Sequence, residues 1–100
     1  MAELGTLVSK VRSKNAGPFW LTVDVFCDTP EIYARVRAGL EDAVVARLFG
    51  VEVQLLKRFD IAALNVVKFS VPRPVVQGTR ADRDMHGAGW GCLLEELEIA

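Results

Sequence analysis

The residues best suited to bind or transform a ligand lie in three segments of this 100-residue sequence. In the first segment, residues 13–18 read Ser-Lys-Asn-Ala-Gly-Pro. Lys14 and the backbone amides of a turn there could hold a carboxylate or a phosphate. The same residues are also typical of a helix end, where a basic side chain opposes the helix dipole. The pattern is short, so the sequence leaves both interpretations open.

Asp24 marks the second segment, an alternating stretch in which an aspartate is unusual. If residues 65–71 form a neighbouring strand, Asp24 and Lys68 share one face of a sheet. Their expected neighbours on that face are Thr22, Ser70, Trp20 and Phe26. One interpretation is a cross-strand ion pair. The other is a mixed polar and aromatic surface that binds a partner protein.

The third segment, residues 72–92, has no sustained periodicity and is rich in glycine and charge. Long segments of this kind inside a compact domain are usually functional or disordered. Trp90 and the glycines favour an ordered binding loop. Arg73 and Arg83 are suited to bidentate contacts with a carboxylate or phosphate. Pairing of Arg83 with Asp84 or its neighbours on a solvated loop is an equal alternative.

Metal, nucleophile and nucleotide sites all lack the spacing that they require. His86 is the single histidine, and no zinc or calcium pattern surrounds it. Cys27 and Cys92 show no metal-binding spacing, and neither forms a recognisable nucleophile pair with His86. The glycines of residues 87–91 do not have the spacing of a dinucleotide loop or a P-loop. We therefore expect no metal and no cofactor.

The elements that would position these residues begin with a helix. Within residues 4–11, leucine and valine repeat at i, i+3, i+4 and i+7, which predicts one helical face that Gly17 and Pro18 would end. Residues 19–27 alternate and predict a strand. Residues 28–30, Asp-Thr-Pro, are a typical helix start.

Two helical segments are expected after that start, separated near Gly39 and ended by Gly50. Residues 51–59 and 65–71 read as the strands of a hairpin, and residues 93–99 could add an edge strand. The two helices are long enough for a crossover connection. We predict an α+β fold: a ferredoxin-like sandwich with a three- to four-stranded, largely antiparallel sheet and helices on one face.

Composition limits the possible functions. The chain has 12 Lys and Arg against 13 Asp and Glu, a net charge of −1, which argues against a dedicated DNA or RNA binder. Apolar residues make up 51%, more than a small monomer needs, which suggests an interface. The sequence has no membrane-spanning run and no secretory signal, so we expect a cytoplasmic protein with one domain, residues 1–100.

Two longer motifs carry a family resemblance. They are residues 12–25, Arg-Ser-Lys-Asn-Ala-Gly-Pro-Phe-Trp-Leu-Thr-Val-Asp-Val, and residues 68–74, Lys-Phe-Ser-Val-Pro-Arg-Pro. With them, nearly the whole chain resembles a small domain-of-unknown-function family that accompanies, or is fused to, acyclic terpene utilisation (AtuA-like) proteins. Residues 87–88, Gly-Ala, also match, although Gly89 replaces a glutamine of that family.

The resemblance implies a ferredoxin-like module that works with an AtuA-like large subunit on a hydroxy-acid or acyl-CoA substrate. Our leading hypothesis is a small accessory subunit of a heteromeric enzyme, a hydro-lyase (hydratase or dehydratase), with a shared active site. Asp24 or Asp84, the two candidate catalytic residues, would act in proton transfer or only orient a partner. The residues expected to bind a carboxylate or a CoA phosphate are Lys14, Asn15, Arg73 and Arg83.

Two other functions are left open. A non-catalytic binding module that forms homo-oligomers through its sheet predicts a stable dimer of the isolated chain. A small stand-alone enzyme is disfavoured, because the sequence has no nucleophile constellation. In the leading hypothesis, the partner covers the sheet face that bears Asp24 and the loop after Pro72.

Overall fold

The computed structural model describes residues 2–16, 19–72, 91 and 94–99. In these residues, four strands form the main sheet in the order β2-β3-β5-β4. Their bounds are β2 (Lys10–Asn15), β3 (Trp20–Phe26), β4 (Lys57–Ile61) and β5 (Val66–Pro72). The α-helices are α1 (Leu4–Leu7), α2 (Pro30–Gly39) and α3 (Asp42–Phe49). The short elements are β1 (Ala2–Glu3), β6 (Glu98–Ile99) and the 3-10 turns η1 (Val53–Leu55) and η2 (Ala62–Leu64).

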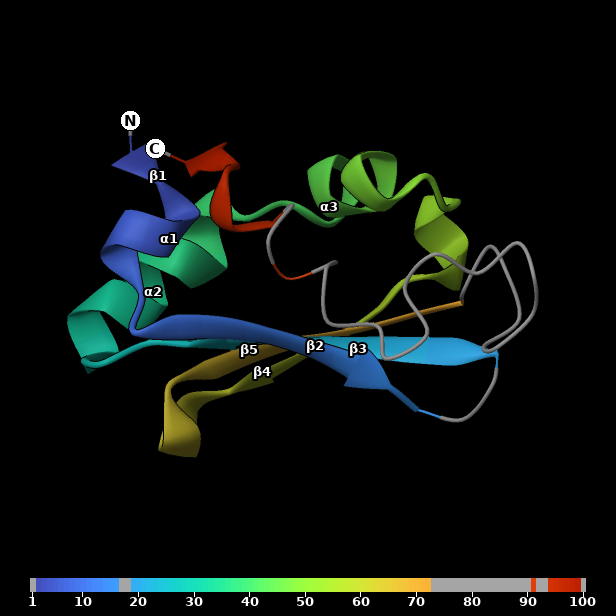
Figure 1. The fold of residues 1–100 in the computed structure, drawn as a ribbon. Coiled ribbons are helices and arrows are strands. Elements are labelled where there is room, and N and C mark those ends of the chain that lie inside the picture. The colour runs from blue at the N-terminus through green and yellow to red at the C-terminus, as the bar shows by residue number, and fades with distance from the viewer. Residues whose placement is uncertain (1, 17–18, 73–90, 92–93, 100) are drawn as a thin grey trace.

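The predicted α+β architecture is confirmed. All pairings in the main sheet are antiparallel, and α1, α2 and α3 lie on the same face of it (Figure 1). Because β3 and β4 each run antiparallel to β5, they are parallel to one another with β5 between them. The pair α2–α3 is therefore the crossover that the sequence predicted.

Both crossover helices begin and end where their terminal residues predict. Thr29 precedes α2, and its hydroxyl oxygen accepts a hydrogen bond from the backbone N–H of Ile32 at 3.2 Å. Pro30 occupies the first helical position, where its missing N–H costs nothing. Gly50 ends α3 in the left-handed conformation, with φ of 69°, which glycine adopts without steric strain.

The predicted N-terminal helix is wrong over most of its length. Only Leu4–Leu7 is helical, and Lys10–Asn15 forms β2, which pairs along its whole length with β3. Leu4, Val8 and Val11 are all buried, as a helix would also bury them, but they reach the core from different elements. Residues 13–15 therefore belong to a strand and not to the end of a helix.

Two predicted strands also need correction. Residues 51–59 contain the turn η1, and the strand starts only at Lys57. The expected edge strand at residues 93–99 is reduced to β6, which pairs with β1 and not with the main sheet. The fourth strand of the main sheet is β2 instead.

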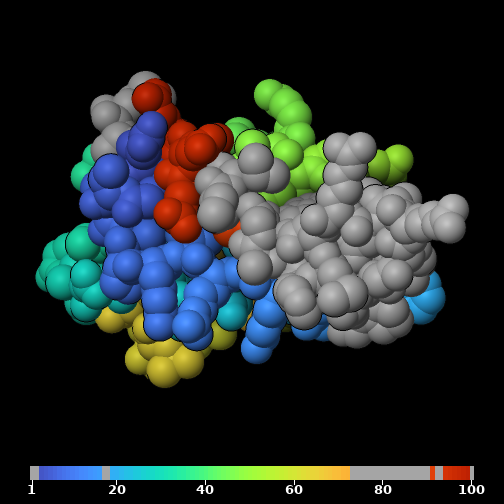
Figure 2. Space-filling view, in the orientation of Figure 1, coloured from blue at the N-terminus to red at the C-terminus, as the bar shows by residue number. Residues whose placement is uncertain are grey.

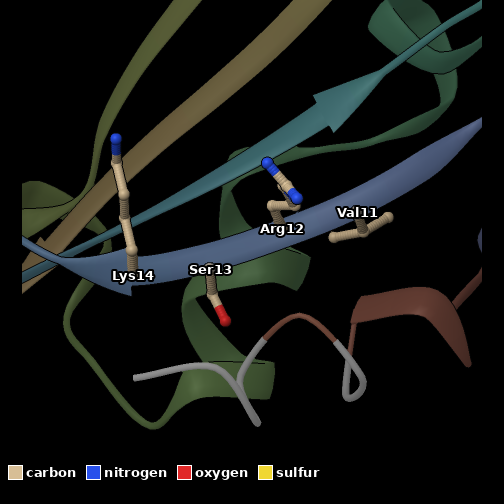
Figure 3. A pocket seen from close by; sticks show the side chains of 4 residues that line it. All are labelled: Val11, Arg12, Ser13 and Lys14. Carbon is tan, nitrogen blue, oxygen red and sulfur yellow. The ribbon is translucent and has the colours of Figure 1, made fainter. Parts of the chain in front are cut away.

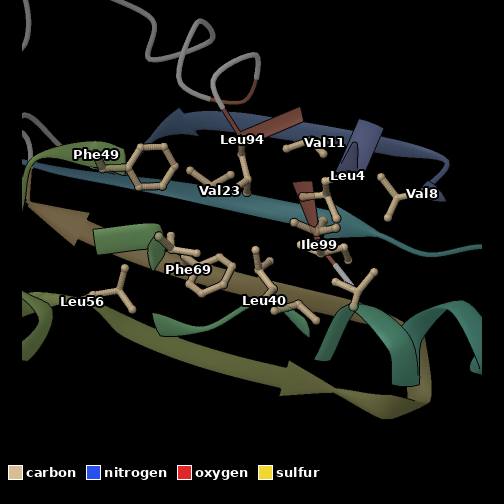
Figure 4. Close-up of a cluster of buried hydrophobic side chains, with 14 of the residues drawn as sticks. Leu4, Val8, Val11, Val23, Leu40, Phe49, Leu56, Phe69, Leu94 and Ile99 are labelled. Carbon is tan, nitrogen blue, oxygen red and sulfur yellow. The ribbon is translucent and has the colours of Figure 1, made fainter. Parts of the chain in front are cut away.

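The hydrophobic core lies between the sheet and the helices. Figure 4 shows Val23 and Phe69 of the sheet packed with Leu40 and Leu94, all of them buried. The C-terminal segment is seated against the N-terminal segment (Figure 2), and the N–H of Leu4 donates to the carbonyl oxygen of Leu97 at 2.7 Å. Both ends of the described chain therefore lie at one end of the molecule.

Candidate functional site

The face of the main sheet opposite the three α-helices is the candidate site, and we call it the open face (Figure 1). Side chains alternate along a strand, and the strand register determines which of them share this face. Its described residues are Lys10, Arg12, Lys14, Trp20, Thr22, Asp24, Phe26, Lys57, Phe59, Ile61, Val66, Lys68, Ser70 and Pro72.

The open face is strongly basic. Among its described residues, five are basic and Asp24 is the single acid. The basic residues are Lys10, Arg12, Lys14, Lys57 and Lys68. The described residues outside this face include four basic and ten acidic side chains. Within the described residues, the near-zero net charge of the chain therefore hides a segregation of charge between the open face and the other surfaces.

Aromatic rings lie between these cations. The ammonium of Lys57 is 5.2 Å from the ring centroid of Trp20, and that of Lys10 is 4.9 Å from the ring centroid of Phe26. Both distances are within the range of a cation–π contact. Phe59 is 49% exposed on the same face. The sequence-based prediction of Trp20 and Phe26 on this face is confirmed.

The centre of the open face contains polar groups without partners. Thr22 is only 8% exposed, and its hydroxyl oxygen has no hydrogen-bond partner among the described residues. The same holds for Oδ1 of Asp24. Across the strands, Asp24 is in register with Arg12 on one side and Lys68 on the other. In the described part of the chain, neither cation forms an ion pair with it, so the expected cross-strand pair is not found.

The strand β2 sends its candidate residues to opposite faces. Lys14 points to the open face, and Asn15, one residue later, points to the helix side. Figure 3 shows Lys14 and Arg12 on one side of β2 and Ser13 on the other. The Ser13 hydroxyl accepts a hydrogen bond from the N–H of Gly91 at 2.8 Å. Lys14 and Asn15 therefore cannot contact the same small ligand on the open face.

A cavity of about 320 Å³ runs along this edge strand. Its described lining residues are Val11, Arg12, Ser13 and Lys14. Because successive residues of β2 line it, the cavity follows the edge of the sheet. It thus adjoins the open face at Arg12 and Lys14.

Several predicted residues lie outside the described part of the chain. These are Arg73, Arg83 and Asp84, together with His86, Trp90 and Cys92. Cys27 is buried, and burial together with the negative charge of Asp28 raises the pKa of its thiol. Cys27 is therefore a poor nucleophile at neutral pH. In the described residues, no three potential metal ligands cluster, and no helix is long and apolar enough to cross a membrane.

Sequence reasoning missed the contributions of Lys10, Lys57 and Phe59 to this face. The signal was present, because Lys10, Arg12 and Lys14 alternate with less polar positions as they do in a strand. Assigning residues 10–15 to a helix removed these three cations from the sheet. The basic character of the open face was lost with them.

Comparison with known proteins gives one finding. Residues 4–98 match a family model described as Domain of unknown function (DUF4387). No curated protein and no solved structure matches the chain.

Proposed function

The chain belongs to the DUF4387 family, and from the geometry of its open face we propose that it is a small accessory subunit that docks onto an acidic surface of a larger enzyme. One observation carries the proposal. Five basic side chains and a single carboxylate, counted among the described residues, occupy the sheet face that lies opposite the α-helices. Complementary charge on a partner would attract this face and orient it.

The charge of the open face favours a different partner over a second copy. If two copies met face to face, the basic residues of each would oppose those of the other. Like charges brought together at an interface cost several kcal/mol and suppress that pairing. Exposed Phe59 and the half-buried rings of Trp20 and Phe26 would supply apolar contact area within the same docking surface.

The identity of the larger enzyme rests on the resemblance of residues 12–25 to the AtuA-associated family. We propose that the partner is an AtuA-like large subunit in the cytoplasm, and that the complex is a hydro-lyase acting on a hydroxy-acid or acyl-CoA substrate. In this arrangement Lys14 and Asp24 face the partner and can contribute to a shared active site. Asn15 faces the other way, which leaves it a role inside this subunit.

The test is co-expression of the chain with an AtuA-like large subunit, followed by size-exclusion chromatography. We expect one co-eluting complex, and at least tenfold weaker association for Lys57→Glu. The matched control is Arg47→Glu, the same change of charge at an exposed position of α3, which should bind like wild type. The proposal would be overturned if the two chains elute separately at micromolar concentration and the large subunit is fully active without the small one. A stable dimer of the isolated chain that changes no enzyme's rate would overturn it as well.

A further inference from the structure

We infer that the centre of the open face is a binding site for a small anion that carries a hydroxyl group beside its carboxylate or phosphate. The site consists of two adjacent rows in the strand register, which we call the central cluster. The rows are Lys14, Thr22, Ser70 and Arg12, Asp24, Lys68. The inference rests on the proposed function for its setting, because the ligand would lie between this subunit and its partner.

The hydroxyl requirement follows from the two oxygens without partners. The Thr22 hydroxyl and Oδ1 of Asp24 are buried, and no described residue donates a hydrogen bond to either. A buried acceptor without a donor is costly, and native proteins leave few of them. Both oxygens are covered in this structure, so a ligand hydroxyl that donates to Asp24 and accepts from Thr22 must first displace the atoms that cover them. An anion without a hydroxyl has no hydrogen to donate to Asp24. It would also place a second negative charge beside that carboxylate.

The anion requirement follows from the cations around these oxygens. Arg12, Lys14 and Lys68 carry three positive charges against the one carboxylate of Asp24, and none of them forms an ion pair with it in the described structure. The Ser70 hydroxyl adds a further donor. The cluster spans three strands and two positions along each, about 10 by 7 Å, which is the size of a small metabolite.

The aromatic residues of the open face argue against single-stranded nucleic acid. Binding of that kind stacks bases on free aromatic rings. Here the ring of Trp20 lies under the Lys57 ammonium at 5.2 Å, and that of Phe26 under the Lys10 ammonium at 4.9 Å. Among the described rings of this face, that leaves Phe59 as a single exposed ring, and one ring is a short platform for a strand of bases. The polar groups without hydrogen-bond partners are instead those of the central cluster.

The direct test is an amide chemical-shift titration of the isolated, ¹⁵N-labelled full chain, with probes in matched pairs. Lactate is compared with propanoate, and glycerol 3-phosphate with methyl phosphate. We expect the hydroxylated member of one pair to shift the amides of Thr22, Asp24 and Ser70 with at least fivefold lower Kd. The pair that shows the preference identifies the carboxylate or the phosphate as the anion. Equal binding within both pairs, or tighter binding of a single-stranded oligonucleotide with quenching of tryptophan fluorescence, would overturn the inference.

Two variants separate a ligand site from general attraction of anions. Asp24→Leu removes the acceptor and one negative charge, so propanoate should bind at least as tightly as before while lactate loses its advantage. Thr22→Val should also reduce the preference. The control is Ser9→Ala. The Ser9 hydroxyl donates to the Phe26 carbonyl oxygen outside the cluster, so this variant should keep the preference for the hydroxylated anion. A preference that survives Asp24→Leu would contradict the inference.

The outcome is independent of the docking test. Lys57→Glu should break association with the proposed large subunit. Lys57 is in register with Ser70, at the end of one row of the cluster, so the isolated variant should bind both members of each pair more weakly. It should still prefer lactate to propanoate or glycerol 3-phosphate to methyl phosphate, because Thr22 and Asp24 are unchanged. If docking fails and the preference remains, the proposed function is wrong and the ligand site stands. If docking holds and no preference is seen, the ligand site is wrong.

Discussion

Thr22 gives a test of the open face at the scale of one residue. Its hydroxyl is buried without a partner among the described residues, so replacing it with the isosteric valine removes an unpaired polar group from the sheet. We expect Thr22→Val to raise the free energy of unfolding by about 1 kcal/mol. Urea denaturation measures the change. Thr29→Val is the matched control and should lower it by about 1 kcal/mol, because the Thr29 hydroxyl oxygen caps α2.

A stabilised Thr22→Val protein would mean that the threonine costs stability and is retained for another reason. Functional sites often carry this kind of local cost. A destabilised variant would instead show that the hydroxyl has a partner in solution. That result would remove one of the two oxygens on which the central cluster depends.

Cys27 predicts a dependence of stability on pH. Burial, and secondarily the charge of Asp28, raises the pKa of its thiol above the ordinary value of 9.0. The unfolded chain therefore ionises first, so this contribution to stability is fully present below pH 9 and is lost as pH rises through the folded pKa. The free energy of unfolding in urea should fall between pH 8 and pH 10 in both proteins, and it should fall less in Cys27→Ala than in wild type. Identical losses would show that the thiol is accessible in the folded protein.

At the scale of elements, Arg58 holds the crossover helices to the sheet. From β4 its guanidinium donates to the carbonyl oxygens of Leu40 and Arg37, at the end of α2, where carbonyls have no partner within the helix. It also pairs with Asp42 at 3.0 Å and Asp60 at 2.9 Å. Burial alone would lower the pKa of Arg58, but these two carboxylates reverse the direction and raise it.

Breaking this contact should cost more than the loss of an ordinary surface charge. The side chain of Arg58 is only 15% exposed. Arg58→Met would leave two carbonyls and two carboxylates without it, and we expect a loss of about 2–3 kcal/mol in the free energy of unfolding. Arg47→Met, at an exposed position of α3, should change stability by less than about 0.5 kcal/mol. Similar effects of both changes in thermal or urea unfolding would contradict this role.

The elements also show how far the sequence could be read. Thr29, Pro30 and Gly50 fixed the ends of α2 and α3 through local chemistry, so those helices could be predicted. β3 and β5 were predictable because their side chains alternate over seven residues each. Residues 4–11 were not, because leucine and valine at helical spacing there reach one core from a short helix, a turn and a strand. Only the pairing of β2 with distant residues decides between these states.

The same limit applied to the candidate site. Asp24 and Lys68 could be placed side by side, because both lie on predictable strands. The cations of β2 and β4 could not be added to them, since the strand assignments there were wrong or too long. Lys14 and Asn15 are adjacent in sequence, and only a strand separates them to opposite faces. The roles predicted for Arg73, Arg83 and Asp84 remain predictions.

At the scale of the whole molecule, the basic open face and the two described chain ends lie on opposite sides of the sheet. The open face is basic, and the other described residues carry an acidic excess. The pairing of β1 with β6 brings both described ends together beside α1, on the helix side of the sheet (Figure 1). The two described ends therefore lie away from the open face.

If the open face docks onto the proposed large subunit, this arrangement predicts that salt weakens the association. At 0.1 M salt, dissolved ions screen the interaction between exposed charges that are more than about 10 Å apart. The attraction between a basic face and an acidic partner therefore falls as the salt concentration rises. We expect the association constant, measured by calorimetry, to drop about tenfold between 50 and 500 mM NaCl. Lys57→Glu should bind more weakly with a shallower salt dependence, whereas Arg47→Glu should follow wild type. An association constant independent of salt would mean that apolar contacts of Trp20, Phe26 and Phe59 dominate, and that the charge of the open face serves the ligand and not the docking.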